Sequence, residues 1–322
     1  MSGEALRRVT ARATLTLVLA FAGVFATLAF APNPSATDGE RYLTRFEEVA
    51  TSTEPAFAQR AEPLSSTLLT WIERVLTLEF GRAGPGGAPV GELVVESLAF
   101  SAVYLLPALV VAVGVGTGVQ LLAVANGGRA SLVTRALAVV LVSVPAFLLA
   151  FAATQTVPVE LAKRIGTDVT AFDYQLELSP VAGQNLRAAT FPFAAAVVYL
   201  TGIQMRYAGT ELSPLVDEPF VRVARAKGAG RVRLAIHLFP HVAARLATAL
   251  FTDTLGTFLL GVYVFEWVTG VPGFGALTID AVGARDPGLT FAVLLLPVLV
   301  GVLASTGREL YYAFLDPRVD AG

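Results

Sequence analysis

Long apolar runs separated by shorter polar segments set the pattern of this sequence. Six of the runs are long enough to cross the hydrocarbon core of a membrane as helices, which takes roughly 17–25 apolar residues. Alanine, valine and leucine dominate these runs, which are too long for membrane-spanning strands, so the pattern predicts helices rather than a barrel. We place the helices near residues 13–31, 98–124, 132–155, 188–207, 243–265 and 288–312. The predicted fold class is an all-α polytopic membrane protein with one transmembrane domain over residues 1–322.

The first apolar run allows two interpretations. Basic residues precede it and Ala29-Phe30-Ala31 follows it, an arrangement typical of a secretory signal with small residues at its cleavage site. The run is longer than a usual signal core. We therefore expect an uncleaved first membrane span.

Several residues inside the predicted spans depart from the apolar pattern. Four spans contain a proline, which membrane helices tolerate when neighbouring groups satisfy the freed carbonyls: Pro107, Pro145, Pro192 and Pro297. Gly114 and Gly118 lie four residues apart and predict close helix packing. Asp253 and, more weakly, Gln204 are candidates for a solute path. Because burying an acid in a span costs about 2.5–3.5 kcal/mol, Asp253 predicts either a path-lining role or a structural hydrogen bond within the bundle.

The overall composition agrees with a membrane protein and excludes some chemistry. Hydrophobic residues make up 55% of the chain and charged residues 15%, against about 25% charged residues in soluble domains. The chain has no cysteine, which excludes disulfides, thiol catalysis and thiolate metal sites. The two histidines and two methionines argue against a transition-metal site. No hydrolase, kinase, dehydrogenase or Walker motif is present, so we expect a non-catalytic protein that binds no cofactor.

The distribution of charge predicts the orientation. Basic residues concentrate in the loops at 126–135 and 206–242. Acidic residues concentrate in the other loops, from Asp38 to Glu96, from Glu160 to Glu177, and at Glu266, Asp280 and Asp286. Because short cytoplasmic loops carry an excess of lysine and arginine, both basic loops and both termini are predicted to be cytoplasmic. The loop at 32–97 is then external, and the protein is a multi-pass protein of the cell membrane.

The external loop contains one segment with helical periodicity. Leu64 to Phe80 places apolar residues, Trp71 and Ile72 among them, at the spacing of an amphipathic helix. One interpretation is a helix that lies on the membrane or on the bundle. The other is part of a docking surface for an external protein.

The loop at 206–242 carries the strongest functional signal. Its basic residues crowd into one short stretch between apolar runs: Arg222, Arg225, Lys227, Arg231 and Arg233. Gly228 and Gly230 separate two helix-forming stretches there, which predicts a short helix, a glycine bend and a second helix. Exposed arginines in such a structure can pair with acids of a soluble partner. Ordinary membrane topology would also account for the charges.

The sequence around this bend resembles a known family. RVARAKGAGRVRLAIHLFPH is similar to the conserved cytoplasmic loop, often called the EAA loop, of permeases in binding-protein-dependent ABC transporters. The A-R-A-K-G version is typical of the first permease subunit of the dipeptide, oligopeptide and nickel group. VFEWVTGVPGFG and the ending LYYAFLDPRV resemble the P-G-x-G segment and the D-P-R ending of the same family. Arg222 and Val223 depart from the pattern, because the family has an acid and an alanine at these positions.

The resemblance implies a type I ABC importer permease fold. It also implies a second permease, two cytoplasmic ATPase subunits that bind the ATP, and an extracellular substrate-binding protein. Transferred to this sequence, the residues that couple the permease to the ATPases are Arg222, Ala224, Arg225, Ala226, Lys227, Gly228 and Arg231. The implied cargo is a di- or oligopeptide, with nickel or a sugar oligomer as alternatives. A secondary transporter is the alternative class, against which the absence of a sequence repeat argues.

Overall fold

The computed structural model describes residues 3–30, 64–83, 87–126, 129–249, 255–284 and 286–315. Among these residues, helices account for almost all regular structure. The strands in this part of the chain, β1 (Arg82–Ala83) and β2 (Ala88–Pro89), form one antiparallel pair with Arg82 opposite Pro89. The predicted all-α class is confirmed for the described residues.

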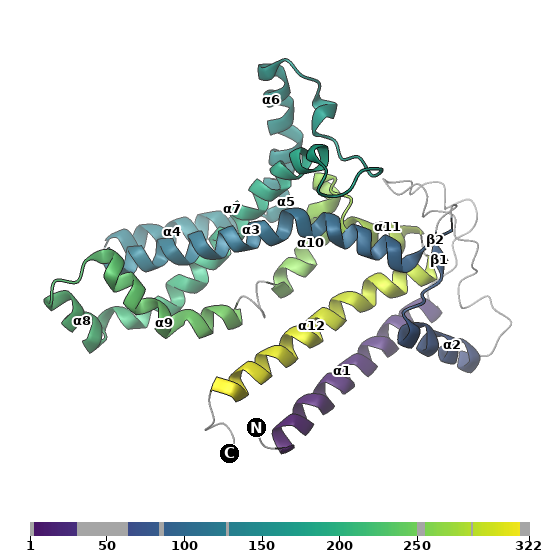
Figure 1. Cartoon of the computed structure of the whole chain (residues 1–322), viewed down its shortest axis with the longest axis horizontal. Helices are drawn as coiled ribbons and strands as arrows, with labels where there is room; N and C mark the ends of the chain where they lie inside the picture. Colours follow the sequence, from purple (N-terminus) through teal and green to yellow (C-terminus); the bar gives the residue numbers. More distant parts are fainter. Residues whose placement is uncertain are drawn as a thin grey trace. The chain divides into compact units, whose positions relative to one another are not determined.

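The chain divides into two compact units, of which the first comprises Met1–Phe100 and Pro272–Gly322. Its helices α1 and α12 pack along each other (Figure 1), and α2 lies against both through a cluster around Trp71 and Phe291. The unit contains, with the strand pair, the elements α1 (Gly3–Phe30), α2 (Leu64–Thr77), the start of α3 (Val90–Asn126), α11 (Phe274–Ala284) and α12 (Pro287–Leu315).

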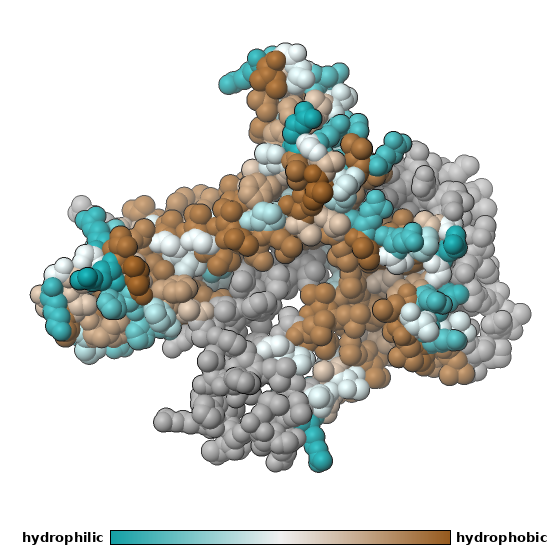
Figure 2. Space-filling model, viewed as in Figure 1, coloured by the Kyte–Doolittle hydropathy of each residue, from teal (hydrophilic) through white to brown (hydrophobic). Residues whose placement is uncertain are grey.

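The second unit, Ser101–Val271, is built around α7 (Gly183–Leu212), which packs against α4, α5 and α9. Figure 2 shows hydrophobic residues along much of α3 and α4 and hydrophilic residues at the end where α8 lies. The other elements of the second unit are the rest of α3, α4 (Arg129–Ser143), α5 (Ala146–Phe151), the π-helical turn η3 (Ala152–Thr156), α6 (Val157–Ile165), the 3-10 turns η4 (Val169–Phe172) and η5 (Ser213–Asp217), α8 (Pro219–Ala226), α9 (Arg231–Ala249) and α10 (Leu255–Thr269).

The predicted count of six spanning helices is not confirmed. Among the described residues, three helices are long and apolar enough to span: Val90–Asn126, Gly183–Leu215 and Gly288–Gly307. The number rises to five if each of two broken helix pairs counts as one span. The first predicted span is part of α1, whose apolar stretch Thr10–Ala26 is shorter than this criterion requires. The findings establish a helical membrane protein with three to five candidate spans in the described part of the chain.

The third predicted span, 132–155, is a broken helix rather than a continuous one. The helices before and after the break, Ala130–Ser143 and Ala146–Ile165, meet at 78°. Pro145 stands between them with extended backbone angles (φ −56°, ψ 136°) and acts as the N-cap of α5. Proline has no amide hydrogen and disfavours helical geometry in the preceding residue, which explains the break. The other three prolines lie inside α3, α7 and α12.

Glycine does bring α3 and α7 together, although not at the predicted positions. A Cβ added at Gly116 would lie 2.9 Å from Cβ of Gln204, so only glycine permits this approach. A Cβ at Gly114 or Gly118 would meet nothing within 4 Å in the described structure. The prediction of packing at Gly114 and Gly118 is therefore wrong for contacts among the described residues. Gly116 lies between them, on the helix face that meets α7.

Candidate functional site

Helix α8 begins where the chain leaves α7 and the turn η5. Glu218 is extended (φ −62°, ψ 144°), and Pro219 follows in the first turn of the helix. Proline is favoured there because its ring presets a helical φ and its missing amide hydrogen would have had no partner inside the helix. The main-chain oxygen of Glu218 accepts hydrogen bonds from the amides of Val221 (3.0 Å) and Arg222 (3.2 Å). The short helix is therefore started by local backbone geometry.

The same helix ends in a glycine-dependent Schellman motif. Gly228 has φ +74°, and its amide donates to the carbonyl oxygen of Arg225 at 2.9 Å. The amide of Ala229 donates to the carbonyl oxygen of Ala224 at 3.0 Å, which completes the motif. A Cβ added at Gly228 would meet nothing within 4 Å in the described structure. The glycine is therefore required by its left-handed backbone rather than by crowding within this chain.

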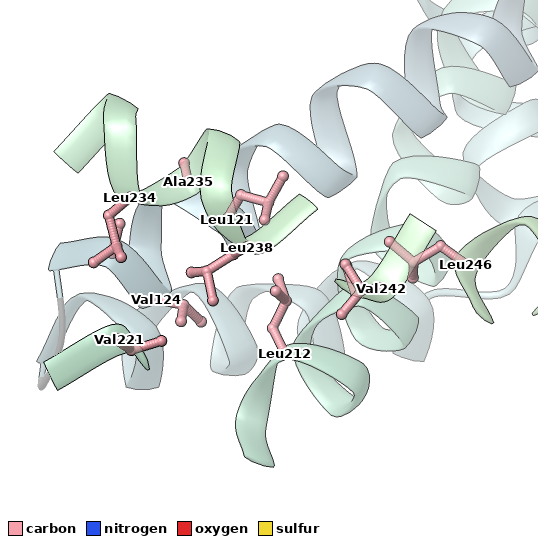
Figure 3. Packing of buried hydrophobic residues seen from close by; sticks show 11 residues of the cluster. Leu121, Val124, Leu212, Val221, Leu234, Ala235, Leu238, Val242 and Leu246 are labelled. Atoms are coloured by element: carbon pink, nitrogen blue, oxygen red, sulfur yellow. The ribbon is translucent and has the colours of Figure 1, made fainter. Parts of the chain in front are cut away.

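The inner face of α8 is anchored by Val221, which is 0% exposed. Its side chain enters an apolar cluster at this end of the second unit, which we call the α8 cluster (Figure 3). The cluster draws residues from α3, α7, α8 and α9: Leu121, Val124, Ala125, Ala208, Leu212, Val221, Leu234, Ala235, Leu238, Val242 and Leu246. Close side-chain packing therefore joins α8 to α3, α7 and α9.

The outer side of α8 and the first turns of α9 carry exposed residues, which together we call the α8–α9 surface. It is defined by seven exposed residues: Phe220, Arg222, Val223, Lys227, Arg231, Val232 and Ile236. Apolar side chains lie among its cations, for instance Val223, which is 52% exposed. Arg233, also exposed, extends the basic character along α9. A mixture of apolar and arginine side chains is typical of protein interfaces.

Arg225 makes a hydrogen bond to another helix of the same unit. Its Nη2 donates a hydrogen bond of 3.3 Å to the main-chain oxygen of Val124, in the last turn of α3. The final carbonyls of a helix have no partner within the helix, and a basic side chain is a favourable donor for them. Arg225 thus links α8 to α3, an arrangement that no local pattern in the sequence predicts.

The remaining predicted site residues occupy different environments. Ala224 packs partly buried against the α8 cluster, whereas Ala226 is exposed. Gln204 is buried, and its Nε2 donates a hydrogen bond of 3.1 Å to Oγ1 of Thr117 in α3. Its side chain is thus engaged between α3 and α7, and a role in the solute path stays a prediction. Asp253 lies outside the described residues.

Glu266, which the charge distribution predicts on the external side, is a buried acid in the structure. This side chain is 0% exposed in the last turn of α10. Its Oε1 accepts hydrogen bonds from Oγ of Ser101 (2.6 Å) and from the hydroxyl of Tyr104 (3.0 Å), both in α3. The apolar run continues past Glu266 through Trp267 and Val268, a signal that would have extended the predicted span beyond residue 265.

Within the described residues, no group of three or more acidic, histidine or cysteine side chains could hold a metal ion.

The apolar helices and the α8–α9 surface define the class first: a multi-pass membrane protein with an exposed basic helix–glycine–helix structure. Residues 99–321 match the family described as the inner membrane component of binding-protein-dependent transport systems. The chain belongs to this family.

Individual relatives agree with this assignment. A protein of Sinorhizobium fredii named as a peptide ABC transporter permease is 30% identical over 270 residues, covering 80% of this chain and 81% of the relative. A protein of Brucella suis named as a peptide transport system permease is 26% identical over 264 residues, with 80% and 81% covered. The dipeptide transport system permease protein DppB of Bacillus subtilis is 23% identical over 269 residues, with 82% of each chain covered.

Proposed function

We propose that this chain is a permease subunit of an ATP-driven importer and that the α8–α9 surface receives the movement of cytoplasmic ATPase subunits. The observation that carries the proposal is the construction of α8. The helix is anchored inward by Val221, ended by a left-handed glycine, and basic on its outer face. A structure of this kind suits the transmission of force from a soluble partner into helices of a membrane domain.

The proposed transmission follows the packing of the α8 cluster. Each buried leucine of the cluster contributes about 1.5–3 kcal/mol by its removal from water. Pulling α8 away from Leu121 of α3 or Leu212 of α7 would expose such side chains, so these helices move with α8 instead. Closure of the ATPases then shifts the ends of α3, α7 and α9 and alternates access to the solute path. We assign the coupling role to Arg222, Ala224, Arg225, Ala226, Lys227, Gly228 and Arg231, with Val221 as their anchor.

The proposal requires an assembly of several chains. A second permease completes the path, and a binding protein delivers the solute from outside. Two cytoplasmic ATPase subunits bind the ATP, and the α8–α9 surface is the contact of this chain with them. This arrangement places both termini and the segment 206–242 on the cytoplasmic side and residues 32–97 on the external side. Because the chain has no cysteine, a single Arg231→Cys variant tests the orientation. An impermeant maleimide should not label it in intact cells, and external labelling would overturn the orientation.

For the cargo we propose di- or oligopeptides. The support comes from the names of the relatives, which describe peptide and dipeptide permeases. The deciding experiment is uptake into proteoliposomes that contain the full transporter and its binding protein, with labelled peptides, nickel or a sugar oligomer offered separately. We expect ATP-dependent uptake of peptides. Uptake of only nickel or sugar would overturn the cargo, and uptake driven by an ion gradient without ATP would overturn the class.

A further inference from the structure

Helix α2 has two apolar faces, and only one of them is covered by the part of the chain that the structure describes. Trp71 is 0% exposed, and its ring stacks on Phe291 of α12 at 4.6 Å between ring centres. Leu68 and Val75 join the same cluster with Phe25 of α1. This covered face holds α2 against α1 and α12, as Figure 1 shows.

The second apolar face of α2 points away from these helices. Leu69 is 66% exposed, Leu76 is 80% exposed, and Ile72 between them is also exposed. With about 3.6 residues per turn, this face is centred about 100° around the helix from the covered face. A third face, roughly another 100° further round, carries Glu73 and Thr77, both exposed. The helix thus has a protein-facing side, an apolar side and a polar side.

The end of α2 continues the exposed apolar face. Leu78 follows the helix with φ +58° and is 67% exposed. A left-handed conformation costs a residue other than glycine about 1–2 kcal/mol, and glycine is the usual choice after a helix. An exposed leucine in this conformation is accounted for if its apolar side chain has a favourable contact outside the chain.

We propose that the exposed apolar face of α2, formed by Leu69, Ile72, Leu76 and Leu78, lies in the boundary between lipid headgroups and acyl chains. In this arrangement α2 is an interfacial helix that packs against α1 and α12 on one side and contacts lipid on another. Figure 2 shows both hydrophobic and hydrophilic patches over this helix. The proposal rests on the membrane location of the chain and does not depend on the cargo or on the coupling to ATPases.

Helix α2 contacts α1 and α12 near their ends, as the proposed interfacial position requires. Phe291 lies four residues from the start of α12 at Pro287, and Phe25 lies five residues from the end of α1 at Phe30. At about 1.5 Å per residue, α2 therefore crosses these helices about 6–8 Å from their ends. The contacts thus lie near the ends of two apolar helices, where a helix in the headgroup region would meet them.

The exposed residues of α1 and α12 favour lipid, rather than a protein, as the partner of the exposed face of α2. On α1, Leu15, Val18 and Leu19 are exposed, and on α12 Leu303 is exposed, so both helices present apolar surface outward. The exposed face of α2 is likewise formed by apolar side chains. The charged Arg74 instead lies over the Trp71 ring, 4.9 Å from its centre.

Single cysteines in the cysteine-free chain allow a direct test. Spin labels would be attached at Leu69→Cys and Leu76→Cys on the proposed lipid face, and at Glu73→Cys and Thr77→Cys as matched controls on the polar face. The complete transporter would be reconstituted in phospholipid vesicles. Collision rates with oxygen, which concentrates in lipid, and with a water-soluble nickel chelate would then be measured.

We expect the labels at 69 and 76 to collide with oxygen several-fold more than with the chelate. The labels at 73 and 77 should show the reverse. Equal access of the chelate to all four positions would place α2 in water and overturn the proposal. Low rates with both reagents at 69 and 76 would mean that a protein covers this face, which would equally overturn it.

Discussion

Arg225 of α8 donates a hydrogen bond of 3.3 Å to the main-chain oxygen of Val124, at the end of α3. The bond joins the short basic helix to a membrane helix through a carbonyl that has no partner within its own helix. Val221, four residues earlier, is buried in the α8 cluster together with the Val124 side chain. On its buried side, α8 is therefore held by one polar and one apolar contact to α3.

The first prediction concerns the polar contact. Arg225→Gln should lower the stability of the purified permease by about 1 kcal/mol, because the hydrogen bond to Val124 is lost or weakened. Lys227→Gln is the matched control, since it removes a cation from the same exposed region without that bond. Thermal unfolding in detergent would compare the two. Equal melting temperatures would show that the Arg225 contact contributes nothing to stability.

The second prediction uses two valines of the same helix. Val221→Ala removes two methyl groups from a fully buried site and should destabilise the docking of α8 by about 2 kcal/mol. Val223→Ala removes the same groups from a side chain that is 52% exposed and should leave stability almost unchanged. Limited proteolysis near residue 228 would report the release of α8. Identical cleavage rates for the two variants would contradict the anchoring role of Val221.

The third prediction separates backbone conformation from contact at Gly228. Gly228→Val should strain the left-handed position by more than about 1 kcal/mol, because a β-branched side chain disfavours it strongly. Gly228→Asn should retain most of the transport activity, since asparagine tolerates this conformation. Uptake measured at equal membrane levels of the two variants is the test. If asparagine impaired uptake as severely as valine, crowding against a partner rather than backbone strain would explain the glycine.

The fourth prediction concerns the buried acid of α10. Glu266→Leu removes the acceptor of the Ser101 and Tyr104 hydroxyls, and each hydroxyl that loses its buried partner costs about 1–3 kcal/mol. Glu266→Gln keeps an acceptor oxygen and should be milder. Adding Tyr104→Phe to Glu266→Leu should recover part of the loss, because both partners are then absent. Additive losses of stability in the double variant would show that the two residues do not interact.

Features that depend on local pattern could be predicted from the sequence. The helical class follows from the length of the apolar runs, and α2 follows from the spacing of apolar residues around Trp71. The short helix, the glycine bend and the second helix follow from Pro219, Gly228 and Gly230, whose backbone preferences act within a few residues. The family assignment succeeded for the same reason, because its motifs are short contiguous stretches.

Features that depend on distant contacts could not be predicted. Gly116 rather than Gly114 or Gly118 meets α7, because the rotation of α3 about its own axis decides which glycine faces Gln204. The burial of Val221 depends on α3, α7 and α9 meeting at one point. The break at Pro145 had a visible signal, but the same residue type is accommodated inside α3, α7 and α12, so the sequence alone did not separate the two outcomes.

The central claim is that the α8–α9 surface couples this chain to ATPase subunits, and charge reversal tests it most directly. Lys227→Glu combined with Arg231→Glu would set acids of this chain against acids expected on the partner, a juxtaposition that can cost several kcal/mol at an interface. Neither side chain anchors α8, so the permease should reach the membrane at a normal level. The matched control reverses two exposed cations on the same proposed side of the membrane but outside α8 and α9, Arg7→Glu with Arg206→Glu.

The measurement is ATP hydrolysis by the reconstituted transporter, with and without the solute-loaded binding protein. Our account predicts that stimulation by the binding protein falls about tenfold or more in the Lys227 and Arg231 variant. A loss of 1.4 kcal/mol in coupling is sufficient for a factor of ten. The control should keep most of its stimulation. Stimulated hydrolysis near the wild-type rate in the Lys227 and Arg231 variant would contradict the assignment of the α8–α9 surface as the coupling element.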